Sequence, residues 1–325
     1  MTTPRNPACA IRGVGVTAEA NERGMPASGA AVCAVVVTYH ADDALAARLE
    51  LLIPQVGSII IVDNGSTEDE VERLRAMARE PKILLVLNSE NLGVASALNG
   101  GIQRAVELNY RWVVLLDQDS RVERDMIAVF LAIYADFPER DRLAVIGSGY
   151  MDRPSRLPAA QAPNVGALWE RTESVITSGS FLPLGTHACI GPFRDDYFID
   201  YVDTEYCLRA NAKGYSVIQS RRPLLAHAIG ASTEHRLLWV TKRTTNHSPD
   251  RRYYMARNTT VLLREYGNYR WGGWASKGFQ RGFRLCKRIL LYESNKAQKI
   301  AAVMEGWWDG VRGRMGRRRA RGRAG

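Results

Sequence analysis

One apolar run constrains the fold of this chain more than any other feature. Residues 112–116 read Trp-Val-Val-Leu-Leu, and Asp117 and Asp119 follow directly, one residue apart. An unbroken apolar run of this kind is typical of a strand buried on both faces of a parallel sheet. Ligands of open α/β sheets bind beyond the carboxyl ends of such strands. The two carboxylates therefore predict a site for Mg²⁺ or Mn²⁺ on a phosphate, although together with Ser120 and Glu123 they are also typical of a helix start.

Strand-like and helix-like segments alternate through the first half of the chain. The predicted strands are Val32–Tyr39, Ser58–Asp63, Lys82–Leu87, Arg111–Asp117 and Leu143–Ser148. The intervening segments with helical periodicity are Asp42–Gln55, Thr67–Glu80 and Val94–Leu108. This alternation predicts an α/β fold with a mostly parallel central sheet, flanked by helices and joined by right-handed crossovers. With 325 residues, 46% of them apolar, the chain can bury a large core.

Polar residues follow several of these strands. Thr38 and Tyr39 end the first strand, the second ends in Asp63-Asn-Gly-Ser, and an Asn-rich segment beginning at Asn88 follows the third. Each of these is a common turn by itself. Together with Asp117 they predict a phosphate-containing ligand at one edge of the sheet. Because neither Gly-x-Gly-x-x-Gly nor a Walker loop occurs, a dinucleotide dehydrogenase or a P-loop enzyme is not expected.

A second acidic group lies further along the chain. Asp200, Asp203 and Glu205 precede a predicted helix that ends at Lys213-Gly214. Carboxylates at a helix N-terminus can simply complement the helix dipole, which would explain one or two of them. Three acids among apolar neighbours instead indicate a partly buried site with a shifted carboxylate pKa.

The charge of the chain is unevenly distributed. Residues 241–325 hold 21 Lys and Arg against 5 Asp and Glu, a sum of +16, so the rest of the chain sums to −6. Basic residues interleaved with Trp and Phe suit an anionic membrane surface. A solvated helical cap with a disordered Arg-rich tail is the alternative. An Arg-rich tail attracts any polyanion, but no nucleic-acid-reading module accompanies it, so a specific nucleic-acid partner is not expected.

The remaining bulk features favour a cytoplasmic protein. No apolar run reaches the roughly 18 residues that would span a bilayer. The first thirty residues lack the apolar core of a secretory signal and read as a flexible extension. The five cysteines are dispersed and show no paired metal-ligand spacing, which fits a reducing compartment.

Six segments of the chain are notable together: AVVVTYH, IIIVDNGST, NSENLGVASALNGGI, VVLLDQDS, FIDYVDTEYCLRA and RRYYMARN. In this order they resemble the family 2 inverting glycosyltransferases of the GT-A fold, in particular bacterial rhamnosyltransferases of O-antigen and related surface polysaccharides. The resemblance implies a GT-A domain over residues 31–248, divided into a nucleotide-binding half, 31–150, and an acceptor half, 151–248. A flexible extension, 1–30, would precede it, and a basic amphipathic helical region, 249–311, and an Arg-rich tail, 312–325, would follow.

The resemblance also implies roles for individual residues. The nucleotide sugar would be bound by Thr38, Tyr39, Asp63, Asn91, Gly93 and Asp117. A divalent cation would be held by Asp119, with His227 as an additional ligand and Asp117 as a further candidate. Ser178 and Gly179 would lie on the acceptor side. Asp203 would be the catalytic base, with Glu205 as second choice, because the chain reads Val-Asp-Thr-Glu where the family commonly has Glu-Asp-x-Asp. Without the resemblance, a lone histidine such as His227 is more typical of a core or surface position.

The implied activity is the inverting, metal-dependent transfer of a sugar, L-rhamnose from dTDP-L-rhamnose, onto a lipid-linked oligosaccharide. Such an enzyme would be cytoplasmic and peripherally bound to the inner face of the cytoplasmic membrane. The alternatives are a UDP- or GDP-sugar donor in the same fold, or a non-catalytic relative that binds nucleotide sugars or membranes. Because the Gln-x-x-Arg-Trp motif of processive synthases is absent, transfer of one or a few sugars is expected.

Overall fold

The computed structural model describes most of the chain between its two ends. The described residues are 28–150, 167–227, 232–237, 240–245, 247–267, 285–287, 289–291 and 293–318; at residue 150 and between residues 226 and 245 only the backbone is described. Most of the predicted extension 1–30, residues 268–284 of the predicted basic region and residues 319–325 of the predicted tail lie outside these ranges. The predicted domain boundaries therefore stay predictions.

The helices and strands follow the predicted alternation. The strands are β1 (Val32–Thr38), β2 (Ser58–Asp63), β3 (Ile83–Leu87), β4 (Trp112–Asp117), β5 (Ser120–Val122), β6 (Leu143–Tyr150), β7 (Trp169–Arg171), β8 (Ser180–Pro183), β9 (Ser216–His227), β10 (Ser232–Leu237) and β11 (Val240–Thr245). The α-helices are α1 (Leu45–Glu50), α2 (Glu68–Met77), α3 (Val94–Glu107), α4 (Met126–Asp136), α5 (Leu184–Ile190), α6 (Val202–Ala212), α7 (Pro249–Tyr266) and α9 (Lys296–Arg312). The predicted strands and helices of the first half are confirmed, with ends that differ by a few residues.

The main sheet has the order β3-β2-β1-β4-β8-β6-β9-β5, and β7 pairs with β9. Strands β3, β2, β1 and β4 are parallel, so their carboxyl ends meet at one edge. Strand β8 is antiparallel to both β4 and β6, whereas β6 and β9 are parallel. The predicted α/β class with a mostly parallel central sheet is confirmed.

The structure of the segment after Asp119 shows that one alternative was wrong, namely that Asp117 and Asp119 begin a helix. Residues 120–122 do not begin a helix but form β5, which pairs antiparallel with β9. Helix α4 begins only at Met126. Asp117 is therefore the last residue of β4, and Asp119 directly precedes β5. Neither residue caps a helix.

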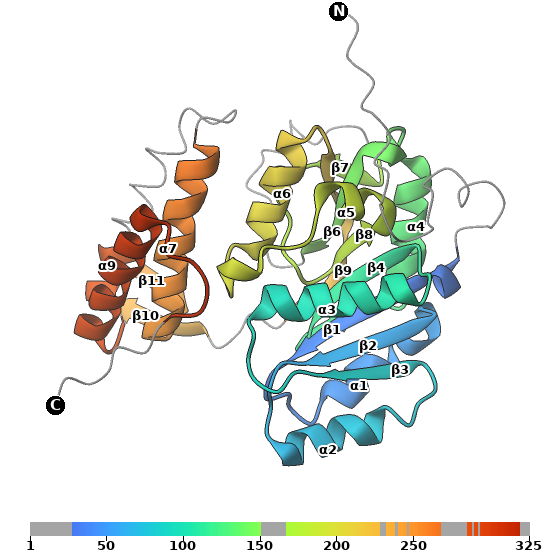
Figure 1. Ribbon diagram of the computed structural model, residues 1–325, viewed down its shortest axis with the longest axis horizontal. Coiled ribbons are helices and arrows are strands. Elements are labelled where there is room, and N and C mark those ends of the chain that lie inside the picture. The colour runs from blue at the N-terminus through green and yellow to red at the C-terminus, as the bar shows by residue number, and fades with distance from the viewer. Residues whose placement is uncertain are drawn as a thin grey trace, which may run out of the picture.

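Helices cover both faces of the sheet, because alternate residues of each strand point to opposite sides (Figure 1). Val32, Ala34 and Val36 of β1 pack in one core, which includes side chains from α1 and α4. Cys33 and Val35 pack in the other, which includes side chains from α3 and α6. The unbroken apolar runs of the sequence are explained by this burial on both faces.

Helices α7 and α9 pack against each other beside this α/β body (Figure 1). Gly306 lies against Tyr253 and Gly310 against Thr260, so the two helices run in the same direction. A Cβ atom at Gly306 would lie 2.2 Å from the carbonyl oxygen of Tyr253, so this close approach requires glycine. Among the described residues, no helix combines the length and the apolarity needed to cross a bilayer.

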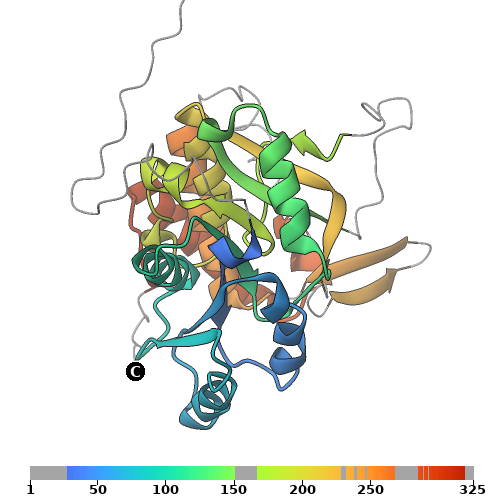
Figure 2. The ribbon, with the colours of Figure 1, turned by 90° about the vertical axis from the view of Figure 1, so that its right-hand side faces the viewer.

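A buried ion triad connects the start of α7 to the segment before α9. Glu293 accepts hydrogen bonds from Arg252 and, at 2.9 Å, from Lys299. All three side chains are buried, so the loss of one partner would leave an uncompensated buried charge. Strands β10 and β11 form a separate antiparallel hairpin that stands out from the side of the molecule (Figure 2).

Candidate active site

Asp63 organises the carboxyl ends of β1 and β2. Its Oδ1 atom accepts hydrogen bonds from Thr38 Oγ1 at 3.1 Å and from Ser66 Oγ at 2.6 Å. Its Oδ2 atom accepts from the backbone N–H groups of Gly65 and Ser66 at 3.2 and 2.9 Å. With four hydrogen bonds from its own chain and almost no exposed surface, the Asp63 carboxylate fixes this turn. Its hydrogen bond to a nucleotide base stays a prediction.

Tyr39 is presented at the same edge by a contact that the sequence did not indicate. The backbone N–H of Tyr39 donates to Gln118 Oε1 at 2.8 Å, and Gln118 Nε2 donates to the Tyr39 carbonyl at 3.2 Å. Gln118 is the residue between Asp117 and Asp119, so the acidic motif is tied to the end of β1. The Tyr39 ring is exposed, which suits the stacking of a base.

Asparagine side chains order the loop between β3 and α3. Asn64 Oδ1 accepts from Asn88 Nδ2 and from the Leu92 N–H, both at 3.1 Å. Asn64 Nδ2 donates to Asn91 Oδ1 at 3.2 Å, and Asn91 Oδ1 also accepts from the Gly93 N–H at 2.9 Å. Asn91 thus shapes the loop at the start of α3. This agrees with the several asparagines of the segment, because asparagine side chains often hydrogen-bond the backbone in turns. Its contact with a nucleotide stays a prediction.

Gly93 brings the start of α3 against the second acidic segment. It has a φ of +89°, and a Cβ atom there would lie 2.6 Å from the carbonyl oxygen of Phe198. The next residue, Val94, donates its N–H to that same oxygen at 2.7 Å. The glycine is therefore required for contact between the nucleotide-side loop and the segment that leads to Asp203.

Asp117 and Asp119 differ in their surroundings. Asp117 is partly buried, and its N–H donates to Ser178 Oγ at 3.3 Å. Asp119 is exposed, and its side chain makes no hydrogen bond or ion pair with the described residues. The backbone of His227 pairs with that of Ser120, directly after Asp119, although the His227 side chain lies outside the description. The sheet thus brings together two segments that are far apart in the sequence.

These residues fit a divalent cation in their chemistry. Asp117 and Asp119 offer hard carboxylate oxygens, the ligand type that Mg²⁺ and Mn²⁺ prefer. Within the described side chains, no group of three His, Cys, Asp or Glu comes together as a complete metal site. Two carboxylates with the phosphate oxygens of a nucleotide are a common arrangement for Mg²⁺, which retains few protein ligands.

Ser178 and Gly179 lie beneath this edge. Ser178 Oγ is 2.5 Å from Ser120 Oγ and accepts from the Asp117 N–H, and the Gly179 N–H donates to the Leu115 carbonyl at 2.8 Å. Both residues are buried and neither lines the cavity described below. The structure gives them contacts that support β4 and β5, and their acceptor-side role stays a prediction.

Two of the three acids near the start of α6 are neutralised by arginine. Asp200 pairs with Arg251, with N–O distances of 3.0 and 3.1 Å. Glu205 is fully buried and accepts from Arg209 through both oxygens at 3.0 Å, and from Tyr266 Oη at 2.8 Å. Glu205 therefore joins α6 to α7 and points away from solvent.

Asp203 is the acid without such a partner among the described residues. It accepts hydrogen bonds from the Thr177 N–H at 3.1 Å, the Thr204 N–H at 2.6 Å and Thr204 Oγ1 at 3.2 Å. Burial raises the pKa of Asp203 above its ordinary value; the hydrogen bonds from Thr204 and Thr177 oppose this shift, and the charge of Asp200 adds to it. A carboxylate with a raised pKa and no cation beside it is suited to accept a proton.

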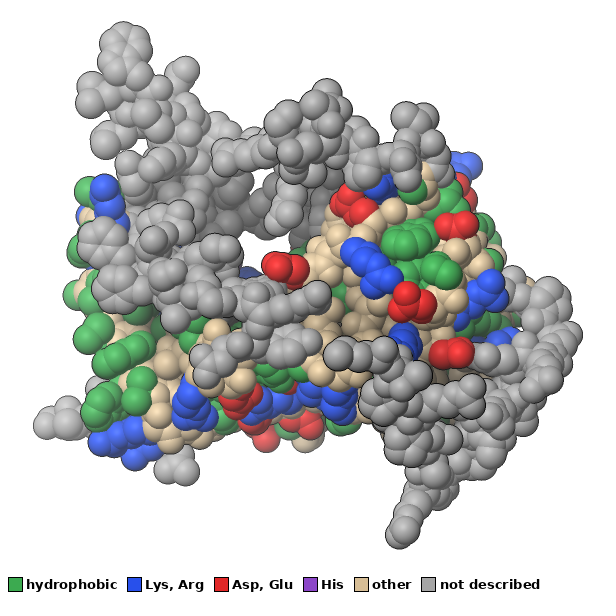
Figure 3. Space-filling model, turned by 90° about the horizontal axis from the view of Figure 1, so that it is seen from above, with side chains coloured by type: hydrophobic (Ala, Val, Ile, Leu, Met, Phe, Trp, Pro, Cys, Tyr) green, Lys and Arg blue, Asp and Glu red, His purple; other side chains and the backbone are tan. Residues whose placement is uncertain are grey.

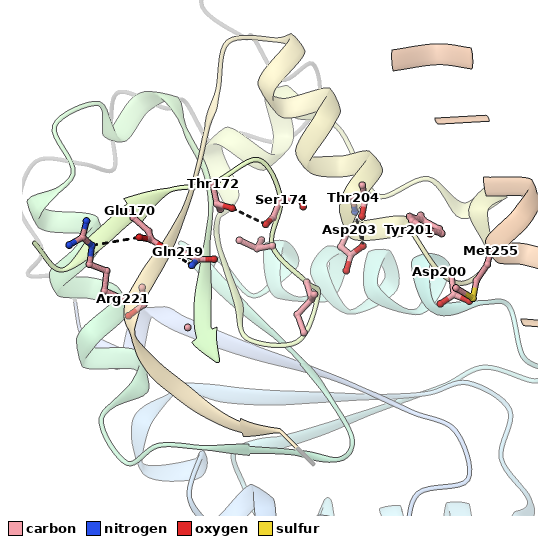
Figure 4. Close-up of a pocket in the computed structure, with 14 residues that line it drawn as sticks. Glu170, Thr172, Ser174, Asp200, Tyr201, Asp203, Thr204, Gln219, Arg221 and Met255 are labelled. Atoms are coloured by element: carbon pink, nitrogen blue, oxygen red, sulfur yellow. Dashed lines mark hydrogen bonds and ion pairs between the residues drawn. The ribbon is translucent and has the colours of Figure 1, made fainter. Parts of the chain in front are cut away.

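A half-open cavity of about 470 Å³ lies in front of Asp203. In Figure 4, Asp203 and Thr204 lie between the two ends of the cavity, one formed by Glu170, Gln219 and Arg221 and the other by Asp200, Tyr201 and Met255. Gln219 Nε2 donates to Glu170 Oε1 at 2.7 Å across the β7–β9 pair. The cavity is therefore polar at both ends and large enough for a ligand of one or two sugar rings.

The segment 251–258, RRYYMARN, holds the loop that leads to Asp203. Phe198, Asp200 and Tyr201 all have positive φ, between +63° and +64°, a strained conformation for residues other than glycine. Buried Asn258 donates to the carbonyls of Tyr197, Ile199 and Asp200 at 2.8–3.0 Å, and buried Arg257 donates to those of Asp196 and Tyr197 at 3.0 and 2.9 Å. The resemblance implied no role for Arg257 and Asn258, which are the last two residues of the RRYYMARN segment.

Residues 33–190 match the family model described as glycosyl transferase family 2. The chain carries a family 2 glycosyltransferase domain. The predicted resemblance is confirmed, and the protein is a glycosyltransferase. The dTDP-rhamnosyl transferase RfbF of Shigella flexneri is 29% identical over 247 residues, which cover 72% of this chain and 80% of that protein. The succinoglycan biosynthesis protein ExoO of Rhizobium meliloti is 30% identical over a shorter stretch, 29% of this chain and 26% of that protein.

Two solved structures share the fold of this glycosyltransferase. The mannosyltransferase PcManGT from Pyrobaculum calidifontis, in complex with GDP-Man and Mn²⁺, has a TM-score of 0.53 at 16% identity and covers 86% of each chain. TarS residues 1–349 from S. aureus, in complex with UDP-GlcNAc, has a TM-score of 0.54 at 13% identity and covers 86% of this chain and 81% of that one. The predicted GT-A fold is confirmed by these likenesses, which carry no information on the sugar.

Proposed function

We propose that this glycosyltransferase performs an inverting, metal-dependent transfer with Asp203 as the base. The observation that carries the proposal is the environment of Asp203. It lines the cavity, its pKa is raised by burial, and the acids on either side, Asp200 and Glu205, are each paired with an arginine. Glu205, the second choice from the sequence, is fully buried and bonded to Arg209 and Tyr266, which favours Asp203.

The sugar donor would bind at the carboxyl edge of β1–β4. The exposed ring of Tyr39 would stack on the base, and Thr38, Asp63, Asn91 and Gly93 shape the surrounding wall. Asp117 and Asp119, with His227 as an additional ligand, would hold a divalent cation. When bound, such a cation supplies positive charge that stabilises a leaving diphosphate.

The acceptor would occupy the cavity, with its attacking hydroxyl group hydrogen-bonded to Asp203. As the hydroxyl oxygen attacks the anomeric carbon, its proton passes to the Asp203 carboxylate and the bond to the diphosphate breaks. One displacement inverts the anomeric centre, so no nucleophile of the enzyme is required. Thr177 and Thr204 fix the carboxylate through their N–H groups, so the oxygen that faces the hydroxyl is held in place.

The dTDP-rhamnosyl transferase RfbF supports a dTDP-rhamnose donor, and the succinoglycan biosynthesis protein ExoO supports polysaccharide synthesis as the setting, which we take to be that of a surface polysaccharide. In that setting the acceptor would be a lipid-linked oligosaccharide, and the enzyme would act peripherally at the inner face of the cytoplasmic membrane. The +16 charge of residues 241–325 supports this location, because anionic lipid attracts basic segments. The use of Mn²⁺ or Mg²⁺ rests on the carboxylate pair.

The donor is tested by measuring release of the nucleoside diphosphate from dTDP-L-rhamnose, UDP-sugars and GDP-sugars, each with and without Mn²⁺ or Mg²⁺. We expect slow hydrolysis of dTDP-L-rhamnose that depends on the metal, and faster release when membrane lipids that carry the acceptor are added. Preferred turnover of a UDP- or GDP-sugar would reject the dTDP donor and retain the fold and the base.

A further inference from the structure

The outer face of α9 is apolar and exposed. Met304, Trp307, Trp308 and Val311, at successive spacings of 3, 1 and 3 residues, lie on one side of the helix and are 47–58% exposed. The opposite stripe of α9 already packs against α7 through Ala302, Val303, Gly306 and Gly310. Helix α9 is therefore apolar on two sides, and only one of them has a partner within the described residues. Two adjacent exposed tryptophans are unusual on a water-facing surface.

The charged groups around this stripe are mostly positive. The Arg312 guanidinium lies 4.3 Å from the Trp308 ring centroid, and the largely exposed Arg314 side chain pairs with Asp309 at 3.7 Å. Both acids of α9 have partners: Glu305 pairs with Arg318 at 2.6 Å, and Asp309, besides its pair with Arg314, accepts from Tyr253 Oη at 2.9 Å. Figure 3 shows hydrophobic side chains gathered at the left edge of the molecule, with Lys and Arg beside them.

We infer that the α9 stripe, Met304, Trp307, Trp308 and Val311, docks this enzyme on an anionic phospholipid surface. Tryptophan suits the boundary between acyl chains and headgroups, because its ring is apolar and its N–H remains able to hydrogen bond. The adjacent arginines would meet lipid phosphates. A second copy of the chain fits less well, since it would place like charges opposite one another. The inference rests on the proposed function for its purpose, because a lipid-linked acceptor must be reached at a membrane.

The full chain should be sedimented with phosphatidylcholine vesicles that contain or lack phosphatidylglycerol. We expect wild type to bind the anionic vesicles, and the variant Trp307→Ser/Trp308→Ser to bind them at least about tenfold more weakly, because both indoles lose their burial in lipid. The matched control is Leu108→Ser/Leu168→Ser, which removes two exposed leucines from the α/β body and should bind as wild type. Equal binding by the tryptophan variant and wild type would overturn the inference.

Donor hydrolysis and sedimentation velocity distinguish loss of lipid docking from misfolding, from a wrong donor and from dimer formation. Metal-dependent hydrolysis of dTDP-L-rhamnose in vesicle-free buffer should be the same for wild type and the tryptophan variant, which shows that the variant is folded. If neither protein hydrolyses dTDP-L-rhamnose, but the variant has the thermal midpoint of wild type and loses vesicle binding, the proposed donor is contradicted and the docking surface is retained. A wild-type dimer in sedimentation velocity that the tryptophan variant converts to a monomer, with unchanged vesicle binding, would assign α9 to a second copy and overturn the inference.

Discussion

The variant Asp203→Asn should transfer sugar about 10²–10⁴-fold more slowly than wild type, the usual contribution of a general base. Asparagine preserves the shape of the side chain and an oxygen that can accept from Thr204, but it cannot take the proton of the acceptor. The affinity for the sugar donor should stay near that of wild type, because Asp203 lies in the cavity and not at the β1–β4 edge. Steady-state transfer and a separate titration of the nucleotide sugar measure the two quantities.

Glu205→Gln is the matched control, since it makes the same chemical change two residues further along α6. Glu205 bonds to Arg209 and Tyr266 in the interior, so we expect a loss of about 1–3 kcal/mol in the free energy of unfolding. The transfer rate of the folded protein should remain within a few fold of wild type. An inactive but folded Glu205→Gln protein beside an active Asp203→Asn protein would mean that the two roles are reversed.

The variant Asp119→Ala should lose metal-dependent turnover by about 10³-fold or more, because stabilisation of the leaving charge by a cation contributes several kcal/mol. The thermal midpoint should stay close to wild type, since Asp119 is exposed and makes no hydrogen bond or ion pair with the described residues. Turnover and binding of the nucleotide sugar should be measured across a Mn²⁺ titration, in which the variant should lose the metal-dependent part of both.

Asp43→Ala is a suitable control for the loss of a carboxylate, because Asp43 is highly exposed and lies in the loop after β1. It should leave turnover and its metal dependence unchanged. Full wild-type activity in EDTA would show that no divalent cation is required and would remove the role assigned to Asp119.

The parallel half of the fold could be predicted because its signals are local. The strands of this half are buried on both faces, so each reads as an apolar run, and the intervening helices show their own periodicity. Strand β5 could not be predicted in the same way. It has three residues and exists because β9, about a hundred residues later in the chain, pairs with it. Non-local pairing of this kind leaves little trace in a local pattern.

In the candidate site, too, residues with a local sequence signal could be predicted, and residues whose role depends on distant contacts could not. Asp117 and Asp119 could be selected from the sequence because acids at the end of an apolar run are conspicuous, whereas Asp203 and Glu205 became candidate bases through the resemblance to family 2 glycosyltransferases. Sequence could not separate Asp203 from Glu205, because the choice depends on Arg209 and Tyr266, and the tyrosine reaches Glu205 from α7.

Supporting residues were the hardest to predict. Gln118 binds the backbone of Tyr39, and Arg257 and Asn258 bind carbonyl groups of the loop that precedes α6. Their partners are main-chain atoms of residues far away in the sequence. Because main-chain atoms are the same in nearly every residue, no residue type marks them as partners. The exposure of Trp307 and Trp308 likewise became clear only once α9 was packed against α7.

Asp203 as the base is tested most directly by the pH dependence of kcat/KM for sugar transfer. The base must be ionised to accept a proton, so the rate falls as the pH falls through the pKa of Asp203. Because burial raises that pKa, the acid limb should lie above the ordinary aspartate value of about 3.9, and the limb should be absent from the residual rate of Asp203→Asn. An acid limb that is unchanged in Asp203→Asn would contradict the assignment and place the base on another residue.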